Sequence, residues 1–368
     1  MLYWLLSPEQ VGVALFRYQT FRAAFAAITA FALALALGHR FIAWLRQRGA
    51  LEDVAKTDSA ELAALRAIKK STPTMGGVLI LGCVLASTLL WARLDEPYVW
   101  GAIAVVVALG AIGIADDWIK LTHARRHGLS SKEKFLAILL LGLVVALALA
   151  IRLSVDGPDA PFELQLPFFK GVALDLSLGH GAAYLALVTL VILSSANAVN
   201  LTDGLDGLAI GCTILVALTL MVYSYVAGRA DYTRYLALAH VPGAGELAVV
   251  CGALIGAGLG FLWFNCFPAQ VFMGDTGSLP LGGVLGYVAV VTRQELMLVL
   301  IGGIFVLEAV SVILQVGSFK LRGVRVFRCA PLHHHFEFGG VPEPKVTVRF
   351  WIVAAMLAMF GMASLKLR

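Results

Sequence analysis

Ten separate stretches of mostly apolar residues constrain this chain more than any other feature of its sequence. A helix needs about 20 such residues to cross the roughly 30 Å hydrocarbon layer of a bilayer, where its backbone must satisfy its own polar groups. The stretches lie approximately at 21–45, 74–92, 99–115, 135–151, 184–199, 207–227, 247–265, 278–292, 296–318 and 347–365. Those at 184–199 and 278–292 are also short enough to be re-entrant segments.

Composition supports the same interpretation. Of the 368 residues, 60% are hydrophobic and only 14% are charged, whereas soluble domains carry about 25% charge. No internal repeat or low-complexity linker divides the chain. The sequence therefore predicts an all-α, polytopic transmembrane helical bundle of about ten spans, formed as a single domain over residues 1–368.

The lysines and arginines between the apolar stretches predict the orientation of the bundle. Most of the 28 basic residues lie in the odd-numbered loops, and cytoplasmic loops carry an excess of Lys and Arg. These loops are therefore predicted to be cytoplasmic, with both termini on the outer side. Because the basic residues are spread over short loops and form no single stripe, the sequence argues against nucleic-acid binding.

Two further features concern the loops and the cysteines. The outer loop at 152–183 contains two short extended pieces, near 162–166 and 172–176, between glycines and prolines, which predicts a small β-hairpin. The five cysteines show no C-x-x-C spacing, so neither a zinc site nor a disulfide framework is indicated.

Every dense polar motif falls on the predicted cytoplasmic side. The motifs are Lys69–Gly77, Asp116–Lys120, Asn197–Gly207, Asn265–Ser278 and Pro331–Glu337. Within them, Asp116 and Asp117 are adjacent carboxylates at the edge of the hydrocarbon, so a metal ion, Lys120 or protonation of one of them must compensate their charge. The alternative is a helix end that merely reaches water.

The acidic residues of the two central motifs predict a metal site. Asp203 and Asp206 share a face if they lie on a helix, with Asn200 one step earlier, and Gly204 leaves room for a ligand. Asp and Asn oxygens are the hard ligands that Mg2+ prefers, although an Asx-rich turn with helix caps is the alternative. Asp275 begins another stretch, where a simple N-cap is possible.

Three further features leave alternatives open. His333, His334 and His335 are consecutive and cannot all face one point, which disfavours a three-histidine zinc site and favours mixed roles, or only a polar loop. Phe272 could stack on a flat base or simply pack. Glu308 stands alone among apolar residues and could pair within the bundle; changing it is expected to matter less than changing the aspartates.

Together these motifs resemble a known family. Asp116-Asp117 and the runs at 200–207 and 274–278 resemble the polyprenyl-phosphate N-acetylhexosamine-1-phosphate transferase superfamily, which is the glycosyltransferase 4 family. The motifs at 73–77 and 331–337 resemble its phospho-N-acetylmuramoyl-pentapeptide-transferase branch. The resemblance covers nearly the whole chain and agrees with its order of spans and loops.

The resemblance implies a reaction and a location. The expected reaction transfers phospho-N-acetylmuramoyl-pentapeptide from UDP-N-acetylmuramoyl-pentapeptide to undecaprenyl phosphate, giving lipid I and UMP, with Mg2+ as the metal. This is the first membrane step of peptidoglycan synthesis, which implies a bacterial inner membrane, a cytoplasmic active site and periplasmic termini.

The resemblance also implies roles for individual residues. Asp275 is the expected Mg2+ ligand with Asp116 or Asp117 beside it, and Asp116 is expected to deprotonate or orient the lipid phosphate. The nucleotide side is implied to contain Asn200, Asp203, Gly204, Leu205, Asp206, Asn265 and Phe272. The phosphates or the sugar-peptide part are implied to be held by Lys70, Thr74, Lys120, His333, His334 and His335, with His333 also expected among the catalytic residues.

Two other functions compete with this one. A sister transferase would move N-acetylglucosamine-1-phosphate to the same lipid, and an ion-coupled secondary transporter would also place acids within a membrane. The sequence leaves open the oligomeric state, a homodimer included, and whether transfer is direct or passes through an aspartyl-phosphate. All of these site predictions require Asp116, Asp203 and Asp275 to meet in the folded protein.

Overall fold

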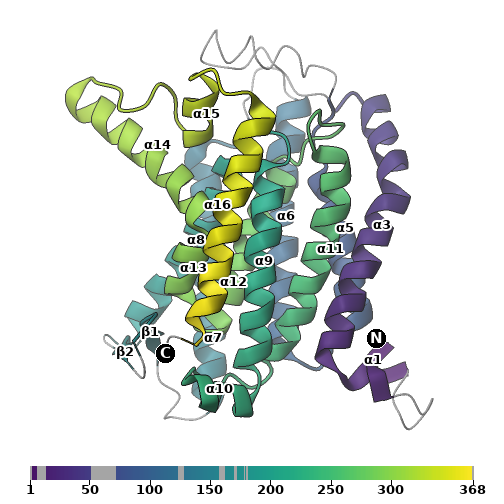
Figure 1. The fold of residues 1–368 in the computed structure, drawn as a ribbon, viewed down its shortest axis with the longest axis vertical. Coiled ribbons are helices and arrows are strands. Elements are labelled where there is room, and N and C mark those ends of the chain that lie inside the picture. Colours follow the sequence, from purple (N-terminus) through teal and green to yellow (C-terminus); the bar gives the residue numbers. More distant parts are fainter. Residues whose placement is uncertain are drawn as a thin grey trace.

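The computed structural model describes residues 2–5, 14–50, 72–122, 128–156, 162–169, 172–177, 179 and 181–366. Within these ranges the chain forms a bundle of helices (Figure 1). Among the described residues, eight helices are long and apolar enough to cross a membrane: α3 (Gln19–Gln47), α6 (Pro97–Thr122), α7 (Ser131–Asp156), α8 (Ala182–Thr202), α9 (Leu208–Ala227), α11 (Leu247–Asn265), α14 (Gly303–Arg322) and α16 (Glu343–Ser364). Two shorter apolar helices are α5 (Gly77–Trp91) and α12 (Asp275–Val291). These ten helices correspond to the ten predicted stretches, and the predicted polytopic helical fold is confirmed.

Short elements join or flank these helices. They are α1 (Leu2–Leu5), η1 (Ala14–Arg17), α10 (Ala230–Leu236), η3 (Ala244–Glu246), α13 (Glu295–Ile301) and α15 (Leu332–Glu337). The predicted hairpin is confirmed as β1 (Glu163–Gln165) paired antiparallel with β2 (Ala173–Asp175), with Glu163 opposite Asp175.

The ninth predicted stretch differs from the structure. It is expected as one helix over 296–318, but α13 ends and α14 begins on either side of Gly302. A Cβ at Gly302 would lie 2.7 Å from the carbonyl oxygen of Leu298, so the backbone at this break leaves little room for a side chain. Beyond the break α14 leans away from the bundle, as Figure 1 shows. Because apolar residues continue on both sides of Gly302, hydropathy alone could not locate this break.

Helix α12 lies at the centre of the bundle. Every residue from Thr276 to Val291 is buried, and the helix packs between α6 and α8. A helix that is apolar on all sides can be surrounded entirely by other helices, as α12 is here. Glycine permits a close approach of α6 to the start of α12, because a Cβ at Gly113 of α6 would lie 2.3 Å from the carbonyl oxygen of Asp275.

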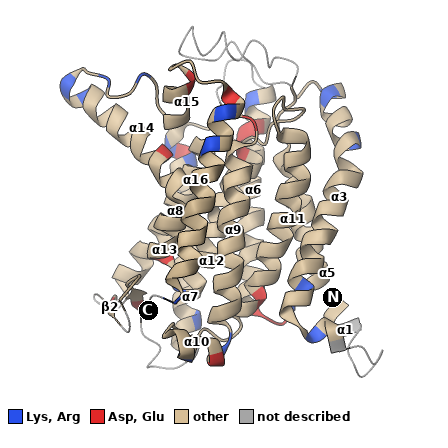
Figure 2. Ribbon diagram, in the orientation of Figure 1, with Lys and Arg blue, Asp and Glu red and all other residues tan. Residues whose placement is uncertain are grey.

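The two ends of the bundle differ in what they carry. One end of the bundle carries α10, the hairpin and the two chain ends that Figure 1 marks N and C. The other end carries α15. Charged residues gather toward these two ends, as Figure 2 shows. At the end near the termini, Arg22 of α3 and Glu246 form a buried ion pair, with Nη2 and Oε1 2.5 Å apart.

Candidate functional site

Three carboxylates meet at the end of the bundle opposite the termini. Asp116 and Asp117 come from the last turns of α6, and Asp275 is the first residue of α12. One oxygen from each lies within 4.8 Å of the others. Asp116 is 2% exposed and Asp117 is 3% exposed, so these charges are held away from bulk water. The predicted meeting of acids from separate motifs is therefore found for Asp116 and Asp275.

Asp117 fixes the start of α12. Its Oδ2 accepts hydrogen bonds from the backbone N–H of Thr276 at 2.9 Å and from the Thr276 hydroxyl at 2.7 Å. Its Oδ1 lies 3.4 Å from the backbone nitrogen of Asp275 and accepts a weaker bond there. A carboxylate at a helix N-terminus satisfies free N–H groups and interacts favourably with the helix dipole. Gly274 adopts a φ of 72°, which glycine tolerates, immediately before this helix.

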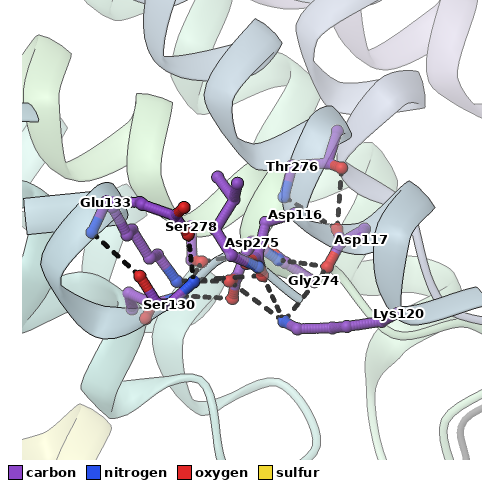
Figure 3. A network of polar contacts seen from close by, with 12 residues as sticks. Asp116, Asp117, Lys120, Ser130, Glu133, Gly274, Asp275, Thr276 and Ser278 are labelled. Carbon is purple, nitrogen blue, oxygen red and sulfur yellow. Dashed lines mark hydrogen bonds and ion pairs between the residues drawn. The ribbon is translucent and has the colours of Figure 1, made fainter. Parts of the chain in front are cut away.

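Two lysines neutralise part of the cluster. The Lys120 ammonium lies 2.5 Å from Asp116 Oδ2, 3.1 Å from Asp275 Oδ2 and 3.5 Å from Asp117 Oδ1. Lys134 of α7 donates to Asp275 as well (Figure 3 shows this network). With all five groups ionised, three carboxylates and two ammonium groups leave one net negative charge.

Lys134 was not among the predicted site residues. It lies in the first turn of α7, where Lys132 is equally basic but exposed. The sequence offers no signal that separates these two lysines, because the choice depends on how α7 is rotated against α6 and α12.

The donor set of the cluster could hold a metal ion. Carboxylate oxygens are hard ligands that suit small divalent cations, and three of them lie together here. Asp116 Oδ1 also accepts the backbone N–H of Leu129 at 2.8 Å, which fixes the orientation of this carboxylate. Lys120 is 39% exposed and ends a flexible chain, so its ammonium can move aside for a cation or toward an anion.

Asn200 joins the carboxylate cluster directly. Its side-chain nitrogen donates to Asp275 Oδ1 at 2.7 Å and to the hydroxyl of Ser278 at 2.8 Å. Among the residues that the structure describes, Asp203 does not belong to the group formed by Asp116, Asp117 and Asp275. Helix α8 ends at Thr202, and Asp203 has left the helical conformation with φ −79° and ψ 50°. The helical spacing that predicted Asn200 and Asp203 on one face therefore does not apply.

Asp206 and Asn265 hold two loops together. Asp206 Oδ2 accepts the backbone N–H of Ala269 at 2.9 Å. Asn265 accepts the N–H of Gly207 at 3.1 Å and donates to the carbonyl of Val271 at 2.9 Å. Both side chains are buried. They join the loop after α8 to the loop after α11.

The motif before α5 runs along the second of these loops. The N–H of Phe272 donates to the carbonyl of Pro73, and the N–H of Gly76 donates to the carbonyl of Phe272, both at 2.8 Å. A Cβ at Gly274 would lie 3.1 Å from the Thr74 hydroxyl, which places Thr74 beside the start of α12. Predicted site residue Leu205 is buried, and Lys70 lies outside the described residues.

The three consecutive histidines have three different partners, as their spacing predicts. The partners are Glu308 for His333, Glu337 for His334 and the backbone N–H of Arg328 for His335. His333 is nearest to the other motifs, because a Cβ at Gly204 would lie 2.2 Å from its Nε2. The structure thus brings His333 against the loop after α8, whereas His335 contacts the segment after α14 through Arg328.

Comparisons with known proteins cover the whole chain. Residues 99–293 match the model of glycosyl transferase family 4, and residues 69–81 match phospho-N-acetylmuramoyl-pentapeptide-transferase signature 1. Proteins called phospho-N-acetylmuramoyl-pentapeptide-transferase from Geobacter sp. (strain M21), Citrifermentans bemidjiense and Pelobacter propionicus are each 49% identical over 371 aligned residues. Each alignment includes 100% of this chain and 100% of the relative.

Proposed function

The chain belongs to the phospho-N-acetylmuramoyl-pentapeptide-transferases of glycosyl transferase family 4, and we propose that its carboxylate cluster transfers the phospho-sugar with Mg2+. The reaction moves phospho-N-acetylmuramoyl-pentapeptide from its UDP-linked donor to undecaprenyl phosphate and gives lipid I and UMP. The observation that carries this proposal is the meeting of Asp116, Asp117 and Asp275 beside two lysines.

The position of the cluster suits both substrates. The donor is soluble and anionic, whereas the acceptor is a lipid with a phosphate head, so they can meet only where the bilayer touches water. The cluster lies near the end of α6, and basic residues of α14 and the segment after it lie toward the same end. By the excess of basic residues in cytoplasmic loops, we place this end in the cytoplasm and both termini in the periplasm of a bacterial inner membrane.

The carboxylates divide between two tasks. Asp275 and Asp116 would hold Mg2+, which when bound would neutralise the charge that develops on the donor diphosphate. Asp116 also orients the lipid phosphate or accepts its proton. Asp117 keeps α12 in place through Thr276, and it also lies beside the two carboxylates that would hold the metal. Lys120 and Lys134 bind phosphate oxygens and stabilise the negative charge that develops on them as the diphosphate bond breaks.

The nucleotide lies against the two joined loops. Gly204, Leu205 and Phe272 form the uridine side, with Asp203 at its edge. Asp206 and Asn265 maintain this side by holding the loops in register, as their buried hydrogen bonds indicate. Asn200 orients Asp275, and Thr74, His333 and His334 contact phosphate or the sugar-peptide part, together with Lys70 and His335.

Purified protein offered each of two UDP-sugars decides between the transferase functions. With undecaprenyl phosphate and Mg2+, UMP release and a lipid-linked product are expected only from UDP-N-acetylmuramoyl-pentapeptide, and EDTA is expected to abolish both. Release of UMP only from UDP-N-acetylglucosamine would overturn the assigned substrate. Uptake of solute into vesicles without any lipid product would instead favour a transporter.

A further inference from the structure

Glu308 is a buried carboxylate that the proposed reaction does not use. It lies in α14, is 0% exposed, and is outside the cluster formed by the three aspartates. An ionised carboxylate is costly to bury unless hydrogen-bond donors or positive charge compensate it. The groups that approach its oxygens therefore indicate why an acid stands in this apolar helix.

Both oxygens of Glu308 face His333. Oε1 accepts the backbone N–H of His333 at 3.1 Å, and Oε2 lies 3.4 Å from the same nitrogen. Oε2 also lies 3.1 Å from the ring atom Nδ1. Because an ionised carboxylate can only accept, this contact is attractive only when Nδ1 carries a proton. In the neutral ring, the lone pair is then on Nε2.

The other ring nitrogen faces the opposite way. A Cβ at Gly204 would lie 2.2 Å from Nε2, so this atom points at the loop between α8 and α9, where only glycine leaves room. Both ring nitrogens of His333 are buried and neither makes a hydrogen bond of good geometry to the described residues, so Nδ1 has only its 3.1 Å contact with Glu308 and Nε2 has no polar partner there. A buried polar atom without a partner is uncommon in folded proteins and is expected to meet a ligand or water.

We propose that Glu308 is a positioning residue for transfer, because it orients His333 so that the Nε2 lone pair accepts a hydrogen bond from a hydroxyl of the UDP-linked donor beside Gly204. This inference rests on the proposed function. The orientation comes from two contacts at once, since the backbone bond holds the start of α15 and the carboxylate beside the ring favours the tautomer with its proton on Nδ1. A glutamine at position 308 could accept from either the backbone N–H or the ring N–H of His333 through its single carbonyl oxygen, but it would present its own N–H to the other.

The tautomer of His333 is the direct measurement. Protein labelled with 15N-histidine in detergent or nanodiscs reports the protonation of each ring nitrogen, and the difference from His333→Asn assigns the signal. The expected result for the unaltered protein is a proton on Nδ1 and none on Nε2. A His333 ring that carries its proton on Nε2 would overturn the inference, and this measurement requires no substitution at Glu308.

The variant Glu308→Gln connects the tautomer to turnover. The expected result is a mixed tautomer population and a kcat lowered at least about tenfold, with a smaller change in KM for the donor, as when an orienting partner is lost. Turnover that falls while the tautomer stays unchanged, or turnover and tautomer that both stay unchanged, would overturn the inference. Glu308→Asp keeps the charge and is expected to recover part of kcat.

Glu295→Gln is the matched control. Glu295 is another buried glutamate, at the start of α13, and its carboxylate has no hydrogen-bond partner in the described part of the chain. This variant is expected to leave both the His333 signal and kcat unchanged. If the unaltered protein releases no UMP, the proposed function fails, whereas the tautomer measurement still tests the contact between Glu308 and His333.

Discussion

Asp117 accepts two hydrogen bonds from Thr276, one from the backbone N–H at 2.9 Å and one from the hydroxyl at 2.7 Å. This pair joins the end of α6 to the start of α12. As a consequence Asp116, the preceding residue, and Asp275, the residue before Thr276, come to lie beside each other. The two adjacent aspartates thus differ, because Asp117 is engaged in holding α12 and Asp116 faces Lys120 and Leu129.

Thr276→Val should weaken this connection. The substitution keeps the shape of the side chain and the backbone bond but removes the hydroxyl bond, which should lower stability by about 1–2 kcal/mol because the Asp117 oxygen loses a donor. Thermal unfolding in detergent measures this. Thr213→Val, which removes only a bond to the carbonyl of Ala209 within one helix, is the control and should lose less. An equal loss in both would contradict the special role of the Asp117 contact.

Asp275→Asn and Asp116→Asn should each lower turnover by at least about a hundredfold, because a neutral amide removes the negative charge that we propose holds Mg2+ and that balances the lysines. The fold should be retained, as checked by thermal unfolding. UMP release at several Mg2+ concentrations is the measurement. Near-normal activity in either variant would remove that aspartate from its proposed role.

Lys134→Gln should lower turnover at least about tenfold, because it removes a positive charge that contacts Asp275 and that we place on the substrate phosphates. Lys132→Gln, two residues earlier on the same helix and exposed, should leave turnover unchanged. Measuring UMP release from both variants side by side separates a site contact from a general loss of basic charge. Equal effects would show that only overall charge matters.

Gly113→Ala should push α12 away from α6. The added Cβ would lie 2.3 Å from the carbonyl oxygen of Asp275, and that oxygen belongs to the backbone and cannot rotate aside. Overpacking of this kind costs about 1–3 kcal/mol, and here it displaces Asp275, which we propose as a Mg2+ ligand, so turnover should fall with stability. Gly82→Ala in α5 is the control, because nothing lies within 4 Å of a Cβ there. A fully active Gly113→Ala would contradict the required closeness of the helices.

Arg22→Leu should destabilise the protein without touching the site. Its guanidinium forms a buried ion pair with Glu246, and removing one member leaves an uncompensated buried charge, which typically costs about 3–5 kcal/mol. Thermal unfolding should therefore shift strongly. Below the new unfolding temperature, the dependence of UMP release on Mg2+ should be unchanged, and a changed dependence would mean that this end of the bundle communicates with the cluster.

The outline of this protein could be predicted from local properties of the sequence. Apolar length determines which segments can cross a bilayer, because a helix satisfies its own backbone polar groups there. Short alternating segments at 162–166 and 172–176 likewise indicated the hairpin that the structure contains. Residue type and spacing identified Asp116 and Asp117 as acids too costly to place at a membrane edge without a partner, and Asp275 as an acid on the same side of the membrane.

Tertiary structure decided which of the predicted residues meet. Lys134 belongs to the cluster while Lys132 does not, because the rotation of α7 against its neighbours depends on packing along the whole helix. Asp203 is not in the cluster, because α8 ends at Thr202 and helical spacing stops there. Contacts between distant segments, such as that of Glu308 with His333, cannot be recognised from the residues around either partner. Separation along the chain does not determine which distant segments pack together.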